Sequence, residues 1–182
     1  MNIIHTPLAG CFIIEPAVYT DSRGYFFESF NEQKFKQEAG SDVHFVQDNQ
    51  SFSSYGVLRG LHFQKGEYAQ AKLVRVIRGK VLDVAVDLRE DSPSYGQWYS
   101  VVLSEKNKLQ FFVPRGFAHG FVVLSKQAEF FYKCDNYYHK ASEGGLHYAS
   151  PELNIDWQIP FEDMLASEKD EVLPHFESLI SI

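Results

Sequence analysis

The segment Val57–Gln64, with the sequence VLRGLHFQ, carries the residues best suited to chemistry. Arg59 offers the two-pronged donor that binds phosphate, and His62 offers an imidazole, the side-chain type whose unperturbed pKa of ~6.5 lies close to neutral pH. Strict alternation along a strand would place these side chains on opposite faces. Gly60 lies between them, and a glycine inside a strand often marks a β-bulge, which would bring both to one side. The segment predicts a base beside a bound anion, against the alternative of a core histidine and a surface arginine.

Five more polar residues share strand parity with apolar neighbours and are therefore expected to face the interior. They are Lys72 (with Val74 and Val76), Tyr132 (with Phe130 and Cys134), His119 (with Phe117 and Phe121), and Gln47 and Asn49 (with Val43 and Phe45). A buried lysine loses hydration, and a buried phenol needs a hydrogen-bond partner. Each residue alone is more often structural, but their convergence on one cavity would indicate a ligand site.

Clustered metal ligands are missing from the sequence. No second histidine lies two to four residues from His62, His119 has no His or Glu at that distance, and His139 and His147 are eight residues apart. The sequence also has no Walker-type loop and no dinucleotide-binding glycine fingerprint. We therefore expect chemistry without a metal or other cofactor. A metal-dependent enzyme stays open as an alternative, because residues distant in sequence can converge in space.

Short strands bounded by turn residues account for most of the chain. We expect strands at Cys11–Tyr19, Tyr25–Phe30, Val43–Phe52, Val57–Phe63, Ala71–Arg78, Lys80–Leu88, Gln97–Leu103, Leu109–Val113, Ala118–Leu124 and Ala128–Tyr137. About ten closely spaced strands without helical crossovers predict an all-β jelly roll, an antiparallel sandwich or barrel, rather than a parallel α/β fold. No linker or repeat divides the chain, so residues 1–182 are expected to form a single domain.

Local signals refine this outline. Alternating residues on both sides of Gly79-Lys80 predict that Lys72–Arg78 and Val81–Leu88 form a hairpin. A short helix is expected at Asn31–Ala39, capped by Asn31 and stopped by Gly40, and another from Ser167 to about Leu173. Helices are thus expected to be few, short and peripheral.

Composition limits the partners. The net charge of −7 argues against broad electrostatic binding of nucleic acid or membranes, so an anionic ligand would need a few placed arginines. Two cysteines predict a reducing compartment, and the first residues lack the basic leader of a signal peptide, so a cytoplasmic protein is expected. The 16 Phe, 10 Tyr and 2 Trp exceed what packing needs, which indicates a further use for aromatic rings.

Six motifs occur in the same order as in one known enzyme family. They are Asp21–Phe30 (DSRGYFFESF), Phe45–Ser51 (FVQDNQS), Val57–Gln64 (VLRGLHFQ), Lys72–Arg75 (KLVR), Val113–Phe121 (VPRGFAHGF) and Glu129–Lys133 (EFFYK). From about Thr6 to Asp170 the chain resembles the dTDP-4-dehydrorhamnose 3,5-epimerases. The LRGLH and PRGFAHGF elements are the most specific parts of this resemblance.

The resemblance implies a cupin-type jelly-roll homodimer that needs no metal or nucleotide cofactor. Its members convert dTDP-4-dehydro-6-deoxy-D-glucose to dTDP-4-dehydro-L-rhamnose, in the biosynthesis of dTDP-rhamnose and of cell-surface polysaccharides such as lipopolysaccharide. By motif, His62 resembles the proton acceptor, Tyr132 the proton donor on the other face of the sugar, and Asp170 the carboxylate paired with the histidine. Lys72 would lie near the oxygen at carbon 4. The matching substrate-binding positions are Arg23, Glu28, Gln47, Asn49, Arg59, His119, Glu143 and Lys169, with Tyr138 stacking on the thymine.

Two other functions remain open at this point. Related enzymes epimerise a single carbon or isomerise a 3-keto and 4-keto pair, and the presence of Lys72 and Tyr132 beside His62 favours the double epimerase over these. A non-catalytic protein that binds sugar nucleotides would keep the arginines and aromatic residues but lose the base or the acid.

Overall fold

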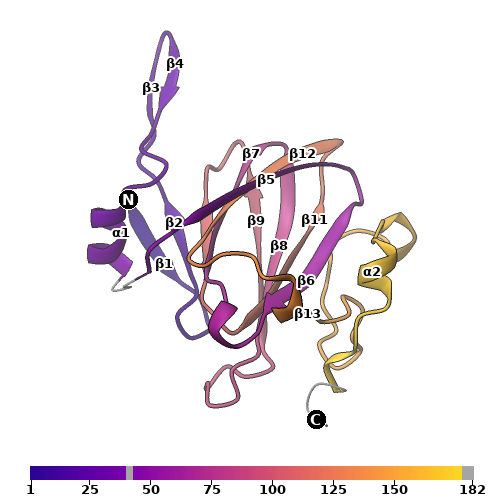
Figure 1. Cartoon of the computed structure of the whole chain (residues 1–182). Coiled ribbons are helices and arrows are strands. Elements are labelled where there is room, and N and C mark those ends of the chain that lie inside the picture. The colour runs from indigo at the N-terminus through magenta and orange to yellow at the C-terminus, as the bar shows by residue number, and fades with distance from the viewer. Residues whose placement is uncertain (40–42, 178–182) are drawn as a thin grey trace.

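Two antiparallel sheets form the body of the molecule in the computed structural model, which describes residues 1–39 and 43–177 (Figure 1). The six-stranded sheet has the order β1 (Asn2–His5), β2 (Phe12–Glu15), β10 (Gln110–Val113), β7 (Lys72–Arg78), β12 (Gln127–Cys134), β5 (Gln47–Ser54). The five-stranded sheet has the order β13 (Glu143–Gly145), β6 (Leu58–Gln64), β11 (Phe117–Val123), β8 (Lys80–Asp87), β9 (Trp98–Ser104).

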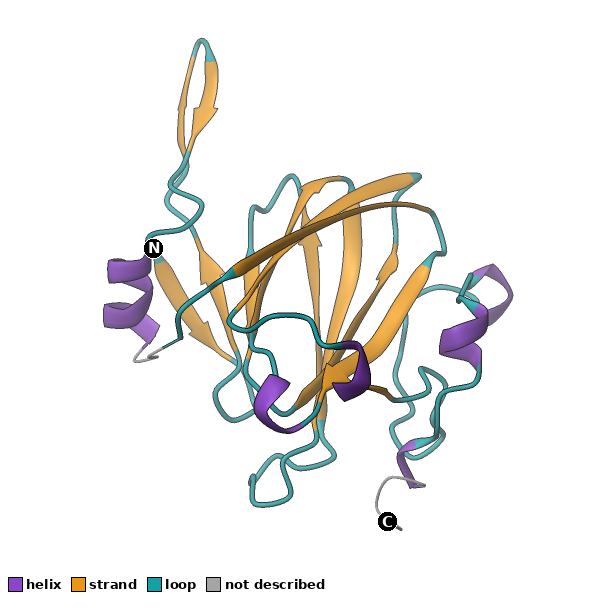
Figure 2. Cartoon of the chain, viewed as in Figure 1, coloured by secondary structure: helices purple, strands orange, loops and turns teal. Residues whose placement is uncertain are grey.

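The sheets pack face to face over a common apolar core. Val74 and Phe130 of the six-stranded sheet lie in the same buried cluster as Val81 and Phe121 of the five-stranded sheet. Strands make up the body and helices lie at its periphery (Figure 2). The expected jelly-roll architecture, with few short helices, is therefore confirmed.

The predicted hairpin between β7 and β8 is wrong. β7 pairs with β10 and β12, whereas β8 pairs with β11 and β9 in the other sheet. The chain crosses between the sheets at Gly79, whose φ is +82°. A side chain there would also meet the carbonyl oxygen of Gln127 at 2.0 Å. Alternation on both sides of a tight turn cannot distinguish strands that pair from strands that pass from one sheet to the next.

The N-terminal part departs from the expected strands in a second way. The run Cys11–Tyr19 is divided at Pro16, which has no N–H for a sheet, so β2 ends at Glu15 and β3 (Tyr19–Asp21) begins later. With β4 (Gly24–Phe26), β3 forms a separate hairpin that extends away from the body (Figure 1). We call residues 19–26 the arm. The short strands β1 and β13, at the sheet edges, were not predicted.

The helices follow their capping signals. α1 (Glu32–Ala39) begins after Asn31, whose Oδ1 accepts the N–H of Lys34 at 3.1 Å, while Gly40 lies outside the described residues. α2 (Glu168–Glu171) begins after Ser167 and is shorter than expected. The 3₁₀ turns are η1 (Gly66–Tyr68), η2 (Lys140–Ser142) and η3 (Phe161–Asp163). Among the described residues, no helix has the length and apolar character needed to cross a membrane.

Candidate active site

A cavity of about 430 Å³ lies between the two sheets and receives side chains from both. It gathers seven of the predicted site residues, which are Arg59, His62, Lys72, His119, Tyr132, Lys169 and Asp170. The first five lie on β6, β7, β11 and β12, and the last two on α2. Lys72, His119 and Tyr132 therefore face the interior, as their strand parity predicts.

The predicted bulge at Gly60 is present and brings Arg59 and His62 to the same cavity. His119 of β11 pairs with His62, and Phe121 pairs with Arg59. Two residues of β6 therefore stand opposite one residue of β11, Gly120. A side chain at Gly60, whose φ is +130°, would meet the Cα of Gly120 at 2.6 Å, so the bulge requires glycine.

His62 is paired with a buried carboxylate. Its Nε2 lies 2.5 Å from Oδ1 of Asp170, which is 3% exposed. The hydroxyl of Ser167 caps α2 by accepting the N–H of Asp170 at 3.2 Å, which places the carboxylate. With the proton on Nε2, bonded to Asp170, the other ring nitrogen, Nδ1, is free to act as a base.

The charge of Asp170 is maintained by its surroundings. Burial raises its pKa, but the hydrogen bond and charge of His62 outweigh burial, together with the Gly60 N–H and the Ser167 hydroxyl. The net result is a pKa below that of an ordinary aspartate. Asp170 is therefore ionised at neutral pH and can stabilise an imidazolium on His62.

A second histidine–aspartate pair lies in the same site. His119 Nε2 is 2.8 Å from Oδ1 of Asp83, which is fully buried on β8. Burial raises the pKa of Asp83, and His119 and Lys72 act against that shift. The other oxygen, Oδ2, is buried without a hydrogen-bond partner. Sequence reasoning missed Asp83, although an acid inside the aliphatic strand Val81–Val86 was a signal for it.

Lys72 and Tyr132 bring an amine and a phenol to the cavity. Burial lowers the pKa of the Lys72 ammonium, and the nearby Cys134 and Asp83 partly oppose that shift. Burial and Cys134 raise the pKa of Tyr132, with Arg59 opposing, so the phenol is protonated at neutral pH. Tyr132 comes from the six-stranded sheet and His62 from the five-stranded sheet. The phenol and the imidazole thus enter the cavity from opposite walls.

Four predicted residues do not line the cavity but are connected through Lys169, which does. They are Glu143, Tyr138, Gln47 and Asn49. Lys169 pairs with Glu143 at 2.6 Å, and Glu143 accepts the hydroxyl of Tyr138 at 3.3 Å. The N–H of Tyr138 donates to Gln47 at 3.1 Å, and Gln47 donates to Asn49 at 3.1 Å. The chain from Lys169 to Asn49 connects these predicted binding residues with one another.

The reasoning that placed Gln47 and Asn49 was wrong in one respect. Asn49 is the cross-strand partner of Tyr132 and shares its inward face. Val43 and Phe45, which were expected on that same face, pack instead in the cluster beneath α1 on the outer side of the six-stranded sheet. Residues 43–46 are not a strand, so side-chain alternation does not carry across them.

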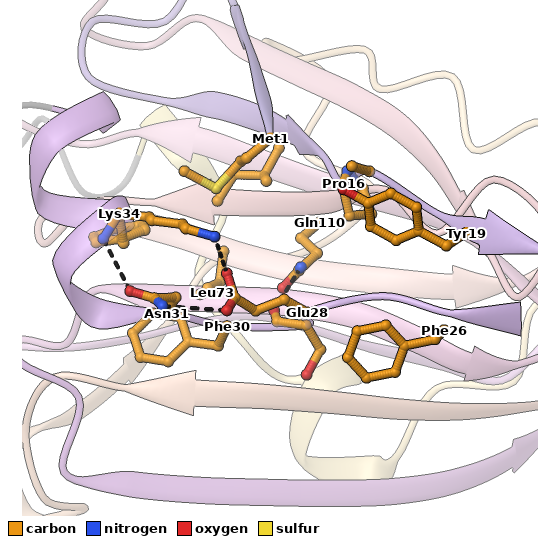
Figure 3. A pocket seen from close by; sticks show the side chains of 14 residues that line it. Met1, Pro16, Tyr19, Phe26, Glu28, Phe30, Asn31, Lys34, Leu73 and Gln110 are labelled. Carbon is orange, nitrogen blue, oxygen red and sulfur yellow. Dashed lines mark hydrogen bonds and ion pairs between the residues drawn. The ribbon is translucent and has the colours of Figure 1, made fainter.

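Arg23 and Glu28 lie away from this cavity. Arg23 is at the tip of the arm, with its side chain 88% exposed and bonded to Asp21 at 2.6 Å. Glu28 lines a separate cavity of about 230 Å³, where it contacts Lys34 at 2.8 Å and Asn31 at 3.2 Å (Figure 3). A single chain therefore does not bring these two predicted binding residues to His62.

The side chains at the cavity define a chemistry. A base paired with a carboxylate, an ammonium and a phenol on the opposite wall are the groups needed to remove a proton beside a carbonyl and to return one to the other face. Within residues 1–39 and 43–177, no three His, Cys, Asp or Glu side chains form a group that could hold a metal ion.

Comparison with known proteins agrees with this chemistry. The model of the dTDP-4-dehydrorhamnose 3,5-epimerase family matches residues 5–178. The Escherichia coli K12 protein of that name is 51% identical over 182 residues, covering 100% of this chain and 98% of its own length.

Solved structures extend the likeness to the fold. The dTDP-4-dehydrorhamnose 3,5-epimerase from Elizabethkingia anophelis has a TM-score of 0.95 and 60% identity, covering 98% of this chain and 97% of its own. The Legionella pneumophila dTDP-6-deoxy-D-glucose-3,5-epimerase, in complex with dTDP-4-keto-L-rhamnose, has a TM-score of 0.93 and 50% identity, covering 97% and 93%. This chain therefore belongs to the dTDP-4-dehydrorhamnose 3,5-epimerase family.

Proposed function

We propose that this chain epimerises carbons 3 and 5 of dTDP-4-dehydro-6-deoxy-D-glucose to give dTDP-4-dehydro-L-rhamnose, without a metal or other cofactor, in dTDP-L-rhamnose biosynthesis. One observation carries the proposal. The paired base His62–Asp170, the Lys72 ammonium and the Tyr132 phenol line one cavity between the sheets. Membership of the family and the keto-sugar bound to the Legionella relative support the choice of substrate.

The first step removes a proton next to the ketone. Nδ1 of His62 takes the proton from carbon 3 or carbon 5, and the C–H electron pair moves to the oxygen at carbon 4, forming an enolate. Lys72 stabilises the negative oxygen, and one such placed donor contributes roughly 10²–10³-fold. The carboxylate of Asp170 stabilises the imidazolium that forms.

The second step returns a proton to the opposite face. The enolate collapses to the ketone as its carbon takes the proton of the Tyr132 hydroxyl, which inverts that carbon. The tyrosinate then takes a proton from solvent, and the imidazolium of His62 gives its proton to solvent. Repeating the cycle at the other carbon flanking the ketone completes the double epimerisation.

The remaining predicted residues bind the nucleotide and the sugar. Arg59 and Arg23 are proposed to hold the diphosphate, which explains how an acidic chain binds an anionic ligand. The exposed ring of Tyr138 is proposed to stack on the thymine. The proposed contacts with the rest of the substrate come from Gln47, Asn49, His119, Glu143, Lys169 and Glu28.

The activity can be tested on chelator-treated protein. After incubation with dTDP-4-dehydro-6-deoxy-D-glucose, borohydride reduction and hydrolysis should yield 6-deoxyhexoses of the L series, identified by chiral chromatography. Recovery of D sugars alone would contradict the proposal. Activity that disappears with the chelator and returns with added metal would instead support a metal-dependent enzyme.

We further propose that the active form is a homodimer in which the arm of each chain reaches the other chain's cavity. The arm exposes the rings of Tyr19, Tyr25 and Phe26, which are poorly suited to permanent contact with water. It also carries Arg23, which a single chain keeps away from its own cavity. Docking on a second copy would cover the rings and complete both sites.

Mixing two inactive variants tests this arrangement. Arg23→Ala and His62→Ala should each be nearly inactive as homodimers. A dimer containing one chain of each would have one site with both native residues, so statistical reassociation should restore about a quarter of the wild-type sites. If Arg23 serves its own chain, the mixture would show no recovery, and a monomer by light scattering would also contradict the proposal.

Replacing Asp170 with asparagine is expected to lower kcat by at least about a hundredfold, because the amide neither stabilises the imidazolium nor fixes the required tautomer. The exposed Glu168 of the same helix provides the control Glu168→Gln, which should keep full activity. Steady-state kinetics at neutral pH measure the effect. Similar losses in both variants would indicate damage to α2 instead.

The pair also predicts a pH dependence of stability. The pKa of Asp170 is lower in the folded protein than the ~3.9 of an unfolded aspartate. The ionised Asp170 therefore contributes its full stabilisation of the folded protein above the unfolded pKa. That contribution is lost as the pH falls through the folded pKa. The difference in melting temperature between the wild type and Asp170→Asn should shrink below about pH 4, and a constant difference down to pH 2 would contradict this account.

We also propose that residues 1–182 act as one epimerase domain in the cytoplasm. The family match over residues 5–178 and the core shared by both sheets support the first statement. The free, buried Cys11 and Cys134 support a reducing compartment.

A further inference from the structure

The loop after β12 holds an aromatic ring in solvent. Tyr138 is 54% exposed, yet its own N–H and the backbone of both its neighbours are hydrogen-bonded. Ordering a loop when a ligand binds costs conformational entropy, so a ring that is already fixed binds its partner more tightly. The residues that fix the loop therefore bear on nucleotide affinity without touching the nucleotide.

Gln64 is central to this loop. Gln64 is 8% exposed and lies at the end of β6. Nε2 donates to the carbonyl oxygens of Tyr68 at 2.7 Å and Tyr137 at 3.1 Å, and Oε1 accepts the N–H of His139 at 2.7 Å. Only an amide in this orientation satisfies two carbonyls and one N–H together. One side chain thus binds the backbone on both sides of Tyr138.

Contacts from other elements complete the support. The N–H of Tyr138 itself donates to Oε1 of Gln47, on β5 of the other sheet, at 3.1 Å. The ring of His139 stacks on Tyr68 with centroids 3.9 Å apart. Three successive residues of the loop, 137–139, are therefore bound to two glutamines that belong to different sheets.

The position of Gln64 in the sequence links this loop to the chemistry. Gln64 lies two residues after His62 on the same strand. β6 therefore carries both the proposed base and the amide that holds the aromatic loop.

We propose that Gln64 is a positioning residue for the nucleotide base, acting through Tyr138. It holds the loop in place before the nucleotide arrives, so that the thymine can stack on the ring of Tyr138 without first ordering the loop. This inference rests on the proposed function, because the stacked group is the thymine of the substrate. No direct contact between Gln64 and the substrate is required.

The expected result is a selective loss of affinity for the thymine of the nucleotide. In Gln64→Met the affinity for dTDP should fall about three- to tenfold, while the affinity for inorganic pyrophosphate, which has no base, should stay unchanged. KM for the sugar nucleotide should rise with little change in kcat. Tyr138→Ala should weaken dTDP binding by on the order of tenfold, and adding Gln64→Met to it should cause no further loss.

A matched control is Ser125→Ala. The Ser125 hydroxyl also contacts backbone groups, the N–H of Lys80 at 2.8 Å and the carbonyl of Gln127 at 2.7 Å, but it does not line the cavity. This variant should keep its affinity for both ligands. Titration calorimetry with dTDP and with pyrophosphate, on the full chain, measures all four variants.

Three results would overturn the inference: equal losses for dTDP and pyrophosphate, additive losses in the Tyr138→Ala background, or dTDP binding that Gln64→Met leaves intact. If Gln64→Met does not fold, Gln64→Glu repeats the series, since it keeps an acceptor for His139 and loses both donors. Hydrogen exchange on the free wild type needs no variant, and fast exchange at the Tyr138 and His139 amides would also overturn it. A wild type that binds no dTDP would overturn the proposed function and this inference together, whereas a wild type that binds dTDP but shows any of the three results above would overturn the inference alone.

Discussion

Replacing His62 with alanine is expected to abolish epimerisation and, with it, exchange of the sugar protons with solvent. A positioned general base contributes roughly 10²–10⁴-fold. The loss should fall at the high end, because Asp170 would also lose its partner at 2.5 Å. The decrease should appear in kcat, with affinity for dTDP nearly unchanged, because the proposed role of the imidazole is to remove a proton from the sugar and not to bind the nucleotide.

The control for this variant is His5→Ala, which removes an exposed histidine from β1. Activity should survive in that protein. Kinetics with the keto-sugar and calorimetry with dTDP give the two quantities separately. Wild-type turnover by His62→Ala would remove the proposed base from the mechanism.

Replacing Tyr132 with phenylalanine is expected to separate proton removal from proton return. The ring and its packing against Phe130 are kept, and only the hydroxyl is lost. His62 can still form the enolate and can return a solvent-derived proton to the face from which it came. Deuterium should therefore enter the starting sugar, while inverted product falls by about 10²-fold or more.

This division of labour has a clear test. Tyr132→Phe is incubated in deuterium oxide, beside the control Tyr99→Phe on β9, and NMR follows both deuterium content and configuration. The control should behave as wild type. If exchange and inversion fall to the same extent in Tyr132→Phe, the phenol is needed for abstraction as well, and separate acid and base walls are ruled out.

Much of the site follows from local sequence rules. Period-2 alternation was enough to point Lys72 and Tyr132 inward, because their strands are regular and one face is buried. The glycine between Arg59 and His62 predicted a bulge, because a regular strand could not place both residues on one side. Ser167 marked the start of the helix that positions Asp170.

Other features depend on which segments meet in space. Which strands pair depends on contacts between segments that are distant in the sequence. The alternating runs on both sides of Gly79 therefore looked like a hairpin, although they belong to different sheets. Asp83 was overlooked because its significance depends on the facing His119, which is 36 residues away in the chain. The separation of Arg23 from the cavity followed from Pro16, which interrupts the first strand before the arm.

The proposed reaction requires proton exchange at both carbons that flank the ketone, and one measurement follows that exchange directly. Chelator-treated wild type is incubated with dTDP-4-dehydro-6-deoxy-D-glucose in deuterium oxide, and NMR records deuterium and configuration at each sugar carbon. We predict deuterium at carbons 3 and 5 together with the L-rhamno configuration. Incorporation at one carbon alone would indicate a mono-epimerase or a ketoisomerase, and no incorporation would contradict the assignment of the cavity to this reaction.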